Sequence, residues 1–478
     1  MARLISPKLF SQHFGVASSV ITTAGLLDPF LNADTKLFID PLLLRKSANS
    51  LISGKGLTAF RKRMSDIISL VEENTPRSGP AWIAAMRLLD LHERRETCLG
   101  YGGKSISGSS RPDKLKAQIL DATREIVQLG IKNPEIIALM GMFEKDVGPD
   151  TISDLTTNAI LPVLEEVTAG FCTANSIPLQ PFTINNEQFQ LPLNPHERGS
   201  GVFLVPRDIL RQLAVATDWS DIDRVVSHNA ALRTEVNKMI ADITKTTITE
   251  KKAAIKKIAF SSAQDFQKLF QDMITGAFSG YDFSKDKKAI EALREALTQT
   301  SSKFPLTIVP PSTPSGPELK RVVDLIVAQF KQLVEHNDLS RLLWDGSKPR
   351  SEKSAQLVFF GVADSYCKAN NLDISPEVNS GGGPVDFKFS SGYAGRLLVE
   401  MKLSSGTVEH GYRTQLGVYQ TAAVTDEGLF IVVNVGKLGN KAIKIRAAQR
   451  AQRDAGLRAA DIVIVDATKK ASASKRQS

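Results

Sequence analysis

The spacing of apolar and polar residues changes character about two thirds of the way along the chain. Over residues 1–300 the dominant pattern is helical, with apolar residues three to four positions apart. This spacing is clear in Leu57–Asn74, Pro112–Gly130, Thr151–Ala174, Ser220–Thr246 and Ser262–Phe278. Strand-like runs are short and few, as in Lys36–Asp40 and within Gln180–Leu193. Residues 1–300 are therefore predicted to be mainly α-helical with a few strands, in one or two subdomains.

The last third of the chain alternates helices with strands. An amphipathic helix over Glu318–His336 leads into this region. Further helices are predicted at Ser351–Asn370, Gly411–Ala423 and Lys441–Ala455. Strands are predicted at Ile374–Asn379, Val385–Phe389, Arg396–Ser404, Leu429–Val435 and Ile462–Asp466. The alternation predicts an α/β domain, in contrast to the mainly helical front region.

Proline and serine mark the boundary between the two regions. Residues 301–317 contain five prolines and several serines, a composition that gives extended, stiff linkers. We therefore divide the chain into a front region at 1–300, a linker at 301–317, an α/β domain at 318–470 and a basic tail at 471–478.

Two predicted strands of the α/β domain carry charged residues inside apolar runs. Residues 391–395 have turn composition, and a hairpin centred on Tyr393 places Asp386 directly opposite Glu400. Lys402 shares the face of Glu400 because side chains alternate along a strand. Two adjacent carboxylates repel unless a cation lies between them, and a hard ion such as Mg²⁺ prefers oxygen ligands. A surface hairpin with an ordinary Glu/Lys pair is the alternative, but unpaired charge in a buried run is costly.

An ordered set of motifs in this domain resembles a known superfamily. Gly381–Asp386 ends in Pro-Val-Asp, Val399–Lys402 reads Val-Glu-Met-Lys, and a helix carrying Gln415-x-x-x-Tyr419 follows. This set resembles the PD-(D/E)XK nuclease superfamily, in particular its RecB-type branch. The resemblance covers about the last third of the chain. It implies a restriction-endonuclease-like core, with a central mixed sheet flanked by helices, and one-step hydrolysis of phosphodiester bonds that leaves a 5′-phosphate.

The metal-binding and catalytic roles follow from the hairpin and the resemblance together. Asp386 and Glu400, with the backbone carbonyl of Met401, are expected to bind Mg²⁺ or Mn²⁺ against the scissile phosphate. Lys402 is expected to orient or deprotonate the attacking water, or to neutralise the pentavalent phosphate.

Three further residues complete the expected site. Gln415 and Tyr419 are four residues apart and share one helix face, and the resemblance places them beside the metal and the nucleic acid. Core packing is the alternative for Tyr419. The RecB-type branch also has a Glu on its opening helix, and Glu352 matches that position, with Glu377 on the first strand as its competitor.

Positive charge is concentrated towards the end of the chain. The net charge is +9, and from Lys437 onward 11 basic residues stand against three acidic ones. Such a concentration favours a phosphate-backbone partner, although a solvated basic face is the alternative. The residues expected to contact nucleic acid are Lys388, Lys441, Lys444, Arg446 and Arg450.

Other site classes find little support. The three cysteines are far apart, which argues against a disulfide framework or a zinc site and favours a reducing cytoplasm. No apolar run reaches membrane-spanning length, and we expect no membrane association. Gly103-Lys104-Ser105 suggests a phosphate loop, but that motif needs a Gly where Cys98 lies and a strand before it.

The sequence thus predicts a Mg²⁺-dependent deoxyribonuclease, a hydrolase with a recognition or regulatory front region. DNA is the expected substrate, with RNA left open, and a restriction-like or antiviral genome-defence endonuclease is the expected context. A double-strand cut needs two sites, hence a dimer or two sequential nicks. The expected protein partners are a second copy of the chain, in a homodimer, or a partner protein that acts through residues 1–300. The alternative is a non-catalytic nucleic-acid-binding or interaction protein with a nuclease-like fold, which would have no need to keep Asp386, Glu400 and Lys402.

Overall fold

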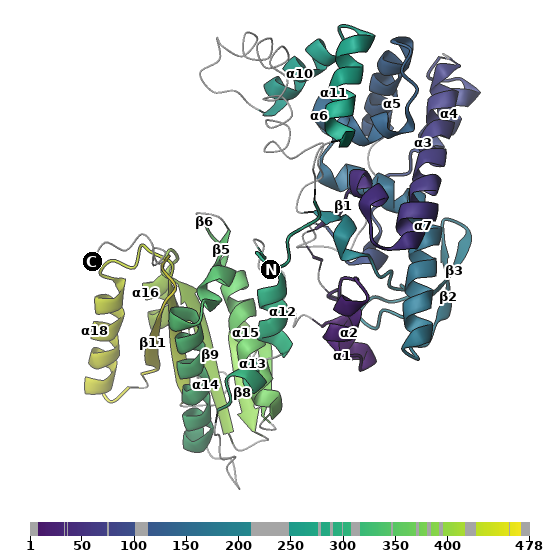
Figure 1. Ribbon diagram of the computed structural model, residues 1–478. Coiled ribbons are helices and arrows are strands. Elements are labelled where there is room, and N and C mark those ends of the chain that lie inside the picture. The colour runs from purple at the N-terminus through teal and green to yellow at the C-terminus, as the bar shows by residue number, and fades with distance from the viewer. Residues whose placement is uncertain are drawn as a thin grey trace, which may run out of the picture. The chain divides into compact units, whose positions relative to one another are not determined.

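The computed structural model describes most of the chain, in two compact units (Figure 1). The described residues are 8–32, 34–35, 37–73, 76–100, 113–211, 248–275, 279–286, 290–298, 300–306, 316–345, 348–369, 372–379, 384–391, 395–415, 427–457 and 459–469. The N-terminal unit ends at Asp282, and the C-terminal unit begins at Phe283, before the segment that we predicted as a linker. Each unit is described by itself.

The N-terminal unit is mainly helical, as predicted. Its α-helices are α1 (Phe10–Phe14), α2 (Ser18–Thr23), α3 (Leu57–Glu72), α4 (Pro80–Leu88), α5 (Asp113–Gln128), α6 (Met140–Phe143), α7 (Pro149–Ala174), α10 (Ile248–Ala259) and α11 (Ala263–Thr275). Its strands are β1 (Phe38–Ile39) paired with β4 (Leu210–Arg211), and the hairpin of β2 (Gln180–Ile184) with β3 (Glu187–Leu191). The helix predicted at 220–246 lies outside the described residues.

Helix α7 is the central element of the N-terminal unit and packs against α3, β1 and β3. It is buried along most of its length, although it contains several polar residues. Thr156 and Thr157 donate their hydroxyl groups to the carbonyls one turn earlier, Ile152 O at 2.6 Å and Ser153 O at 2.7 Å. These bonds satisfy the hydroxyls of Thr156 and Thr157 inside the helix, whereas Thr151 Oγ1, near the start of α7, is buried without a hydrogen-bond partner among the described residues.

The C-terminal unit contains a five-stranded mixed sheet in the order β11-β10-β9-β8-β7. The strands are β7 (Asp373–Asn379), β8 (Pro384–Ser391), β9 (Gly395–Leu403), β10 (Gly428–Asn434) and β11 (Asp461–Asp466). The first three are antiparallel neighbours, whereas β10 runs parallel to both β9 and β11. All five strands were predicted from the sequence, and the mixed α/β class of this unit is confirmed.

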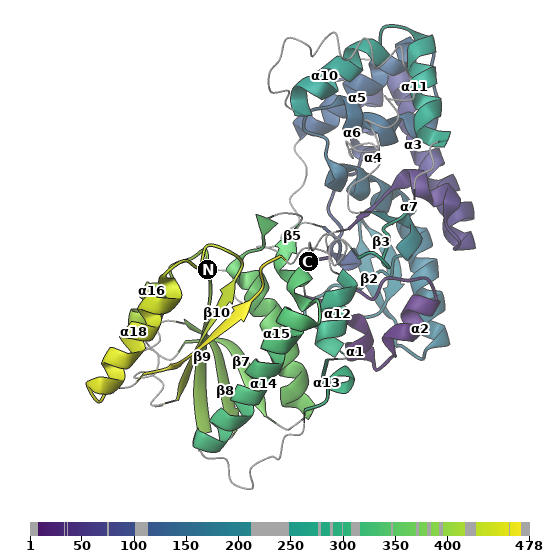
Figure 2. The ribbon, with the colours of Figure 1, turned by 60° about the vertical axis from the view of Figure 1, so that its left-hand side comes forward.

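Helices cover both faces of this sheet (Figure 2). One face packs against α14 (Gly316–His336) and α15 (Glu352–Ala369) through residues such as Phe387, Val399 and Ile431. The other face packs against α16 (Val408–His410) and α18 (Lys441–Asp454) through residues such as Leu398 and Phe430. Because β10 lies between two strands and two helical layers, it is apolar on both faces.

Two short helices, one before the predicted linker and one at its start, also belong to the C-terminal unit. These helices, α12 (Ile290–Thr298) and α13 (Thr300–Lys303), pack against α15. Ser365 of α15 donates its hydroxyl to Ser301 Oγ at 2.8 Å, and the Tyr366 hydroxyl donates to Phe304 O at 2.5 Å. These contacts attach the start of the 301–317 segment to the unit, whereas residues 307–315 lie outside the described ones.

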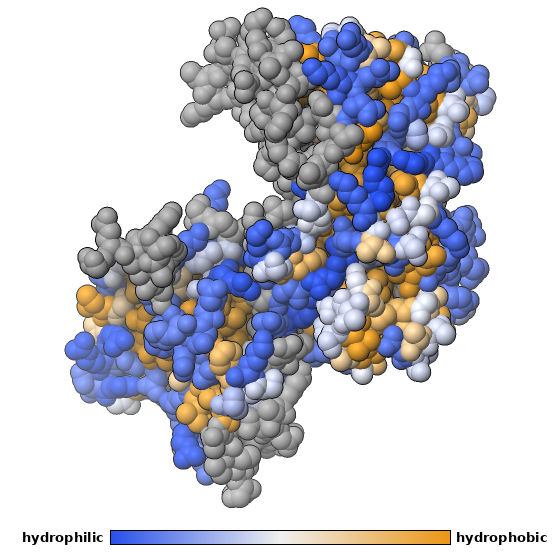
Figure 3. All heavy atoms as spheres, viewed as in Figure 1, coloured by the Kyte–Doolittle hydropathy of each residue, from blue (hydrophilic) through white to orange (hydrophobic). Residues whose placement is uncertain are grey.

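Hydrophilic side chains cover much of the molecular face seen in Figure 3, with hydrophobic side chains showing between them. None of the helices in the described parts of the chain combines the length and the apolar character needed to cross a membrane.

Candidate active site

The candidate site lies where β8 and β9 pair. Their register places Phe387 opposite Val399 and Lys388 opposite Leu398. This register is centred on residue 393, as predicted, and its extension by one step beyond the paired residues would place Asp386 opposite Glu400. The alternation of β9 sends Val399 and Met401 to the α15 side of the sheet, and Glu400 lies between them on the strand.

Glu400 and Lys402 form a buried ion pair at the end of β9. The Glu400 side chain is 3% exposed, and Lys402 Nζ lies 2.8 Å from Glu400 Oε1. The second carboxylate oxygen, Glu400 Oε2, is buried and has no hydrogen-bond partner among the described residues. A buried polar atom without a partner is costly, and it indicates an ion or a water molecule that binds there.

Glu352 reaches the same strand end from the first turn of α15. Its Oε1 accepts a hydrogen bond from Lys402 Nζ at 3.1 Å, and its Oε2 accepts one from Leu403 N at 3.1 Å. Ser351 precedes the helix, and its hydroxyl accepts from Ser354 N at 3.3 Å, so α15 begins where Glu352 can face β9. Glu377, the competing acid, belongs to β7, but its side chain lies outside the described part of the chain.

Asp386 is tied to β9 through the backbone. Its Oδ2 accepts a hydrogen bond from Met401 N at 2.7 Å. Burial and the negative charge of Glu400 raise the pKa of Asp386 to about 7, against the opposing effects of Lys402 and the Met401 N–H. Burial also raises the pKa of Glu400, although Lys402 counteracts it. Both carboxyl groups are therefore hard to ionise in the metal-free protein.

Lys402 is the one cation among these acids in the described structure. Burial alone would lower its pKa, but the charges of Glu400 and Asp386 outweigh burial and raise the pKa of Lys402 above its ordinary value. Two carboxylates, those of Glu352 and Glu400, thus pair with one ammonium group, and the charge of Asp386 also acts on it. The cluster carries more negative charge than it can balance when all of its acids are ionised.

The donor atoms fit a hard divalent cation. In the parts of the chain that the structure describes, no three Asp, Glu, His or Cys side chains gather into a metal-binding group. Mg²⁺, however, retains several waters and is commonly bound by only one or two carboxylates. Asp386, Glu400 and the carbonyl of Met401 supply such a set, and the unpartnered Glu400 Oε2 is its most available donor.

Gly411 is a residue of the site that sequence reasoning missed. It begins η8 (Gly411–Gln415), a short π-helix, and a Cβ at this position would lie 3.1 Å from Lys402 Cε and 3.2 Å from Lys402 Cγ. Glycine therefore lets η8 pack against the Lys402 stem. The only available sequence signal was a glycine at the start of the Gln-x-x-x-Tyr helix. The side chain of Gln415 and all of Tyr419 lie outside the described residues.

The five basic residues expected to contact nucleic acid fall into two groups. Lys441 Nζ donates to Ser404 O at 2.6 Å and to Gly406 O at 3.1 Å, so it braces the turn that follows β9. Lys444 forms an ion pair with Glu409 at 3.1 Å. In contrast, Lys388, Arg446 and Arg450 have no hydrogen-bond or ion-pair partner within the described ranges, and both arginines are exposed.

Two family models match parts of the chain. A domain of unknown function (DUF8370) matches residues 15–218, within the N-terminal unit. A second domain of unknown function (DUF8371) matches residues 319–437 in the C-terminal unit. No curated protein and no solved structure matches the chain. The second match contains Glu352, Asp386, Glu400 and Lys402, and it ends before α18.

Proposed function

We propose that the C-terminal unit is a Mg²⁺- or Mn²⁺-dependent nuclease of the PD-(D/E)XK type that hydrolyses phosphodiester bonds of DNA. One observation carries this proposal: Glu352 and Glu400 pair with Lys402 at the end of β9, Asp386 is bound to the neighbouring Met401 N–H, and a buried oxygen of Glu400 has no partner among the described residues. Charge imbalance of this kind is typical of catalytic and metal-binding sites.

Each residue of the site would have a separate role in the reaction. Asp386 and Glu400, with the Met401 carbonyl, hold the cation. When bound, the cation stabilises charge on the phosphate and lowers the pKa of a bound water. Lys402 keeps its proton because the surrounding carboxylates raise its pKa. It therefore acts as a hydrogen-bond donor and positive charge towards the reacting phosphate rather than as the base. Glu352 positions Lys402 and the end of β9.

Helix α18 offers a surface for the nucleic-acid backbone. Arg446 and Arg450 are four residues apart, so they share one exposed helix face and can meet neighbouring phosphates. The N-terminal unit is a separate compact unit, and we propose that it recognises the target or regulates cutting, as expected of a restriction-like or genome-defence enzyme.

The proposal is tested by incubating supercoiled plasmid DNA with the full-length protein and Mg²⁺ or Mn²⁺, beside an EDTA control. We expect cutting that needs the metal and that Asp386→Asn and Glu400→Gln both abolish. Glu295→Gln, at an exposed position of α12, is the matched control and should cut like the wild type. Cutting that survives both site variants would overturn the assignment. The same assay with RNA in place of the plasmid shows whether the protein cuts DNA, RNA or both.

Activity alone does not separate an inactive fold from an enzyme that lacks its activator. Binding of Mn²⁺ to the full-length protein, measured by titration calorimetry, gives a second readout. Nucleic-acid binding without cutting and without metal binding would favour the alternative, a non-catalytic module with a nuclease-like fold.

A further inference from the structure

The N-terminal unit contains a cleft that the proposed nuclease chemistry does not use. Its volume is about 440 Å³, and its lining comes from α3, the end of α4, the middle of α7 and the β2–β3 hairpin. Small-molecule sites in proteins commonly occupy about 300–1,000 Å³ and combine apolar walls with a few placed polar groups. The cleft therefore has the size of a site for a small organic ligand.

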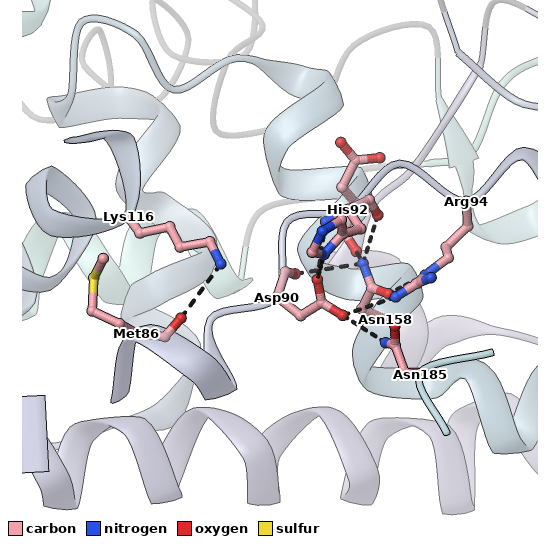
Figure 4. A network of polar contacts seen from close by, with 8 residues as sticks. Met86, Asp90, His92, Arg94, Lys116, Asn158 and Asn185 are labelled. Carbon is pink, nitrogen blue, oxygen red and sulfur yellow. Dashed lines mark hydrogen bonds and ion pairs between the residues drawn. The ribbon is translucent and has the colours of Figure 1, made fainter. Parts of the chain in front are cut away.

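A polar network with its hydrogen bonds satisfied forms one wall of the cleft (Figure 4). Asp90 Oδ2 accepts hydrogen bonds from Arg94 Nη2 and Asn185 Nδ2, both at 2.8 Å. Asp90 Oδ1 accepts from the backbone N–H of His92 at 3.0 Å. Asn158 accepts from Arg94 Nε and donates to His92 O at 2.8 Å. Because Asp90, Arg94 and Asn158 are each held by more than one partner, this wall has a fixed shape.

Two arginines contribute positive charge to the cleft, which Asp66, Asp90 and Glu187 also line. Arg63 on α3 and Arg87 on α4 line it, and neither has a hydrogen-bond or ion-pair partner among the described residues. Arg61, two residues before Arg63, shows the contrast, because its Nη2 lies 2.7 Å from the buried carboxylate of Glu135. Guanidinium groups bind phosphate through paired N–H donors, so two free ones at the same cleft favour a phosphate-bearing ligand.

The remaining lining supplies an apolar surface and hydrogen-bond acceptors. Leu161, Pro162 and the buried ring of Phe189 form the apolar part. Pro162 has no N–H, so the carbonyl of Asn158 lacks its usual helical donor. Glu187 is exposed on the hairpin side of the cleft. A nucleobase needs a surface of this kind, since its flat ring packs on apolar groups and its N–H groups require acceptors.

We propose that this cleft binds a nucleotide, with its phosphates at Arg63 and Arg87 and its base between the apolar wall and the acceptors of α7 and the hairpin. The proposal does not depend on the nuclease function of the C-terminal unit. It assigns the N-terminal unit a small-molecule ligand, through which the chain could sense nucleotides.

The test is titration calorimetry of the full-length protein with each of the four ribonucleoside triphosphates and the corresponding nucleosides, in EDTA so that no metal links phosphates to the C-terminal unit. We expect at least one triphosphate to bind, and its nucleoside to bind at least about tenfold more weakly, which corresponds to about 1.4 kcal/mol. The double variant Arg63→Ala/Arg87→Ala should bind the same triphosphate at least about tenfold more weakly than the wild type does. Arg198→Ala removes an exposed arginine that does not line the cleft, and it should leave binding unchanged.

A second variant leaves every charge in place. Ala59→Trp adds a large side chain at a half-buried helix position that lines the cleft, and it should block the same triphosphate. Thermal unfolding of each variant verifies that it is folded. The proposal is overturned if no triphosphate binds to the wild type, or if binding survives in both the double variant and Ala59→Trp. Binding that survives in both variants would place the nucleotide elsewhere, for example at the Gly103-Lys104-Ser105 segment.

Discussion

Each unit of this protein holds buried carboxylates, and their surroundings differ in kind. In the N-terminal unit, Asp90 accepts hydrogen bonds on both oxygens and lies beside the charge of Arg94. Glu135 is bound by two arginines. In the C-terminal unit, Glu352 and Glu400 share a single lysine whose positive charge also acts on Asp386, and Glu400 Oε2 has no partner among the described residues.

The pKa shifts follow the same division. Burial alone would raise the pKa of Asp90, but hydrogen bonds from His92 and the charge of Arg94 outweigh it and hold the pKa below its ordinary value. At Asp386 the balance is reversed, and burial with the charge of Glu400 raises the pKa to about 7. Balanced carboxylates stabilise a fold, whereas unbalanced ones cost stability and persist where they bind something. The contrast between the units supports a structural role for the first cluster and a functional role for the second.

The largest expected effect separates metal binding from chemistry within the second cluster. Lys402→Ala should lower the rate of plasmid cleavage at least about 100-fold, because it removes the group that assists the reacting phosphate. It should retain Mn²⁺ binding, whereas Asp386→Asn should lose both. Rate measurements at saturating metal, beside calorimetry, distinguish the two variants. Equal loss of metal binding in both would show that Lys402 does not have a separate role.

The next effect compares the stability of the two clusters in EDTA. Arg94→Ala leaves Asp90 and Asn158 without a shared partner, and loss of the donor to such acceptors costs about 1–3 kcal/mol. Glu400→Gln removes a carboxylate from a crowded site, so the melting temperature should stay the same or rise. The melting temperatures of both variants, compared with that of the wild type in EDTA, test this prediction. A strongly destabilised Glu400→Gln protein would contradict the claim that this cluster is unbalanced.

The pH dependence of stability should have opposite signs in the two clusters. The pKa of Asp386 is raised from 3.8 to about 7 in the folded protein, so its contribution to stability is present at low pH. That contribution is lost as the pH rises from about 4 to 7. The pKa of Asp90 is lowered, so its contribution is present at neutral pH and is lost as the pH falls below 3.8. The free energy of unfolding of the metal-free wild type and of Asp386→Asn, measured from about pH 4 to 7, isolates the contribution of Asp386. The same pH dependence in both proteins would refute this prediction.

The smallest effect concerns the surface rather than the buried clusters. Arg446→Ala/Arg450→Ala should weaken DNA binding and reduce the dependence of log affinity on log salt concentration by about 0.9 for each lost phosphate contact. Lys444→Ala, next to them on α18 but paired with Glu409, should change this slope less. Filter binding over a range of salt concentrations measures both. An unchanged slope in the double variant would remove α18 from the nucleic-acid interface.

Local patterns were enough to predict the five strands of the sheet, the helices α14, α15 and α18, and the β8–β9 hairpin of the C-terminal unit. The turn composition at 391–395 and the alternation on either side predicted the β8–β9 register, since a hairpin's centre determines which residues are opposite. Ser351 as an N-cap predicted the start of α15, and this start directs Glu352 towards β9. The restriction-endonuclease-like identity of the fold stays a prediction.

What could not be predicted depends on residues that are distant in sequence. Lys441 was expected to face nucleic acid, but it reaches back to Ser404 and Gly406, a contact that no local pattern encodes. The Asp90 network requires Asn158, 68 residues further along the chain, at the middle of a buried helix. The start of the C-terminal unit at Phe283 likewise depends on tertiary packing, because α12 and α13 lie against α15.

The central claim, that the unbalanced carboxylate cluster is a metal site, is tested most directly by calorimetric titration of the full-length protein with Mn²⁺. The wild type should bind the ion, and Asp386→Asn and Glu400→Gln should both lose this binding. Glu295→Gln should bind like the wild type. Mn²⁺ binding that is the same in all four proteins, or absent from the folded wild type, would contradict the claim.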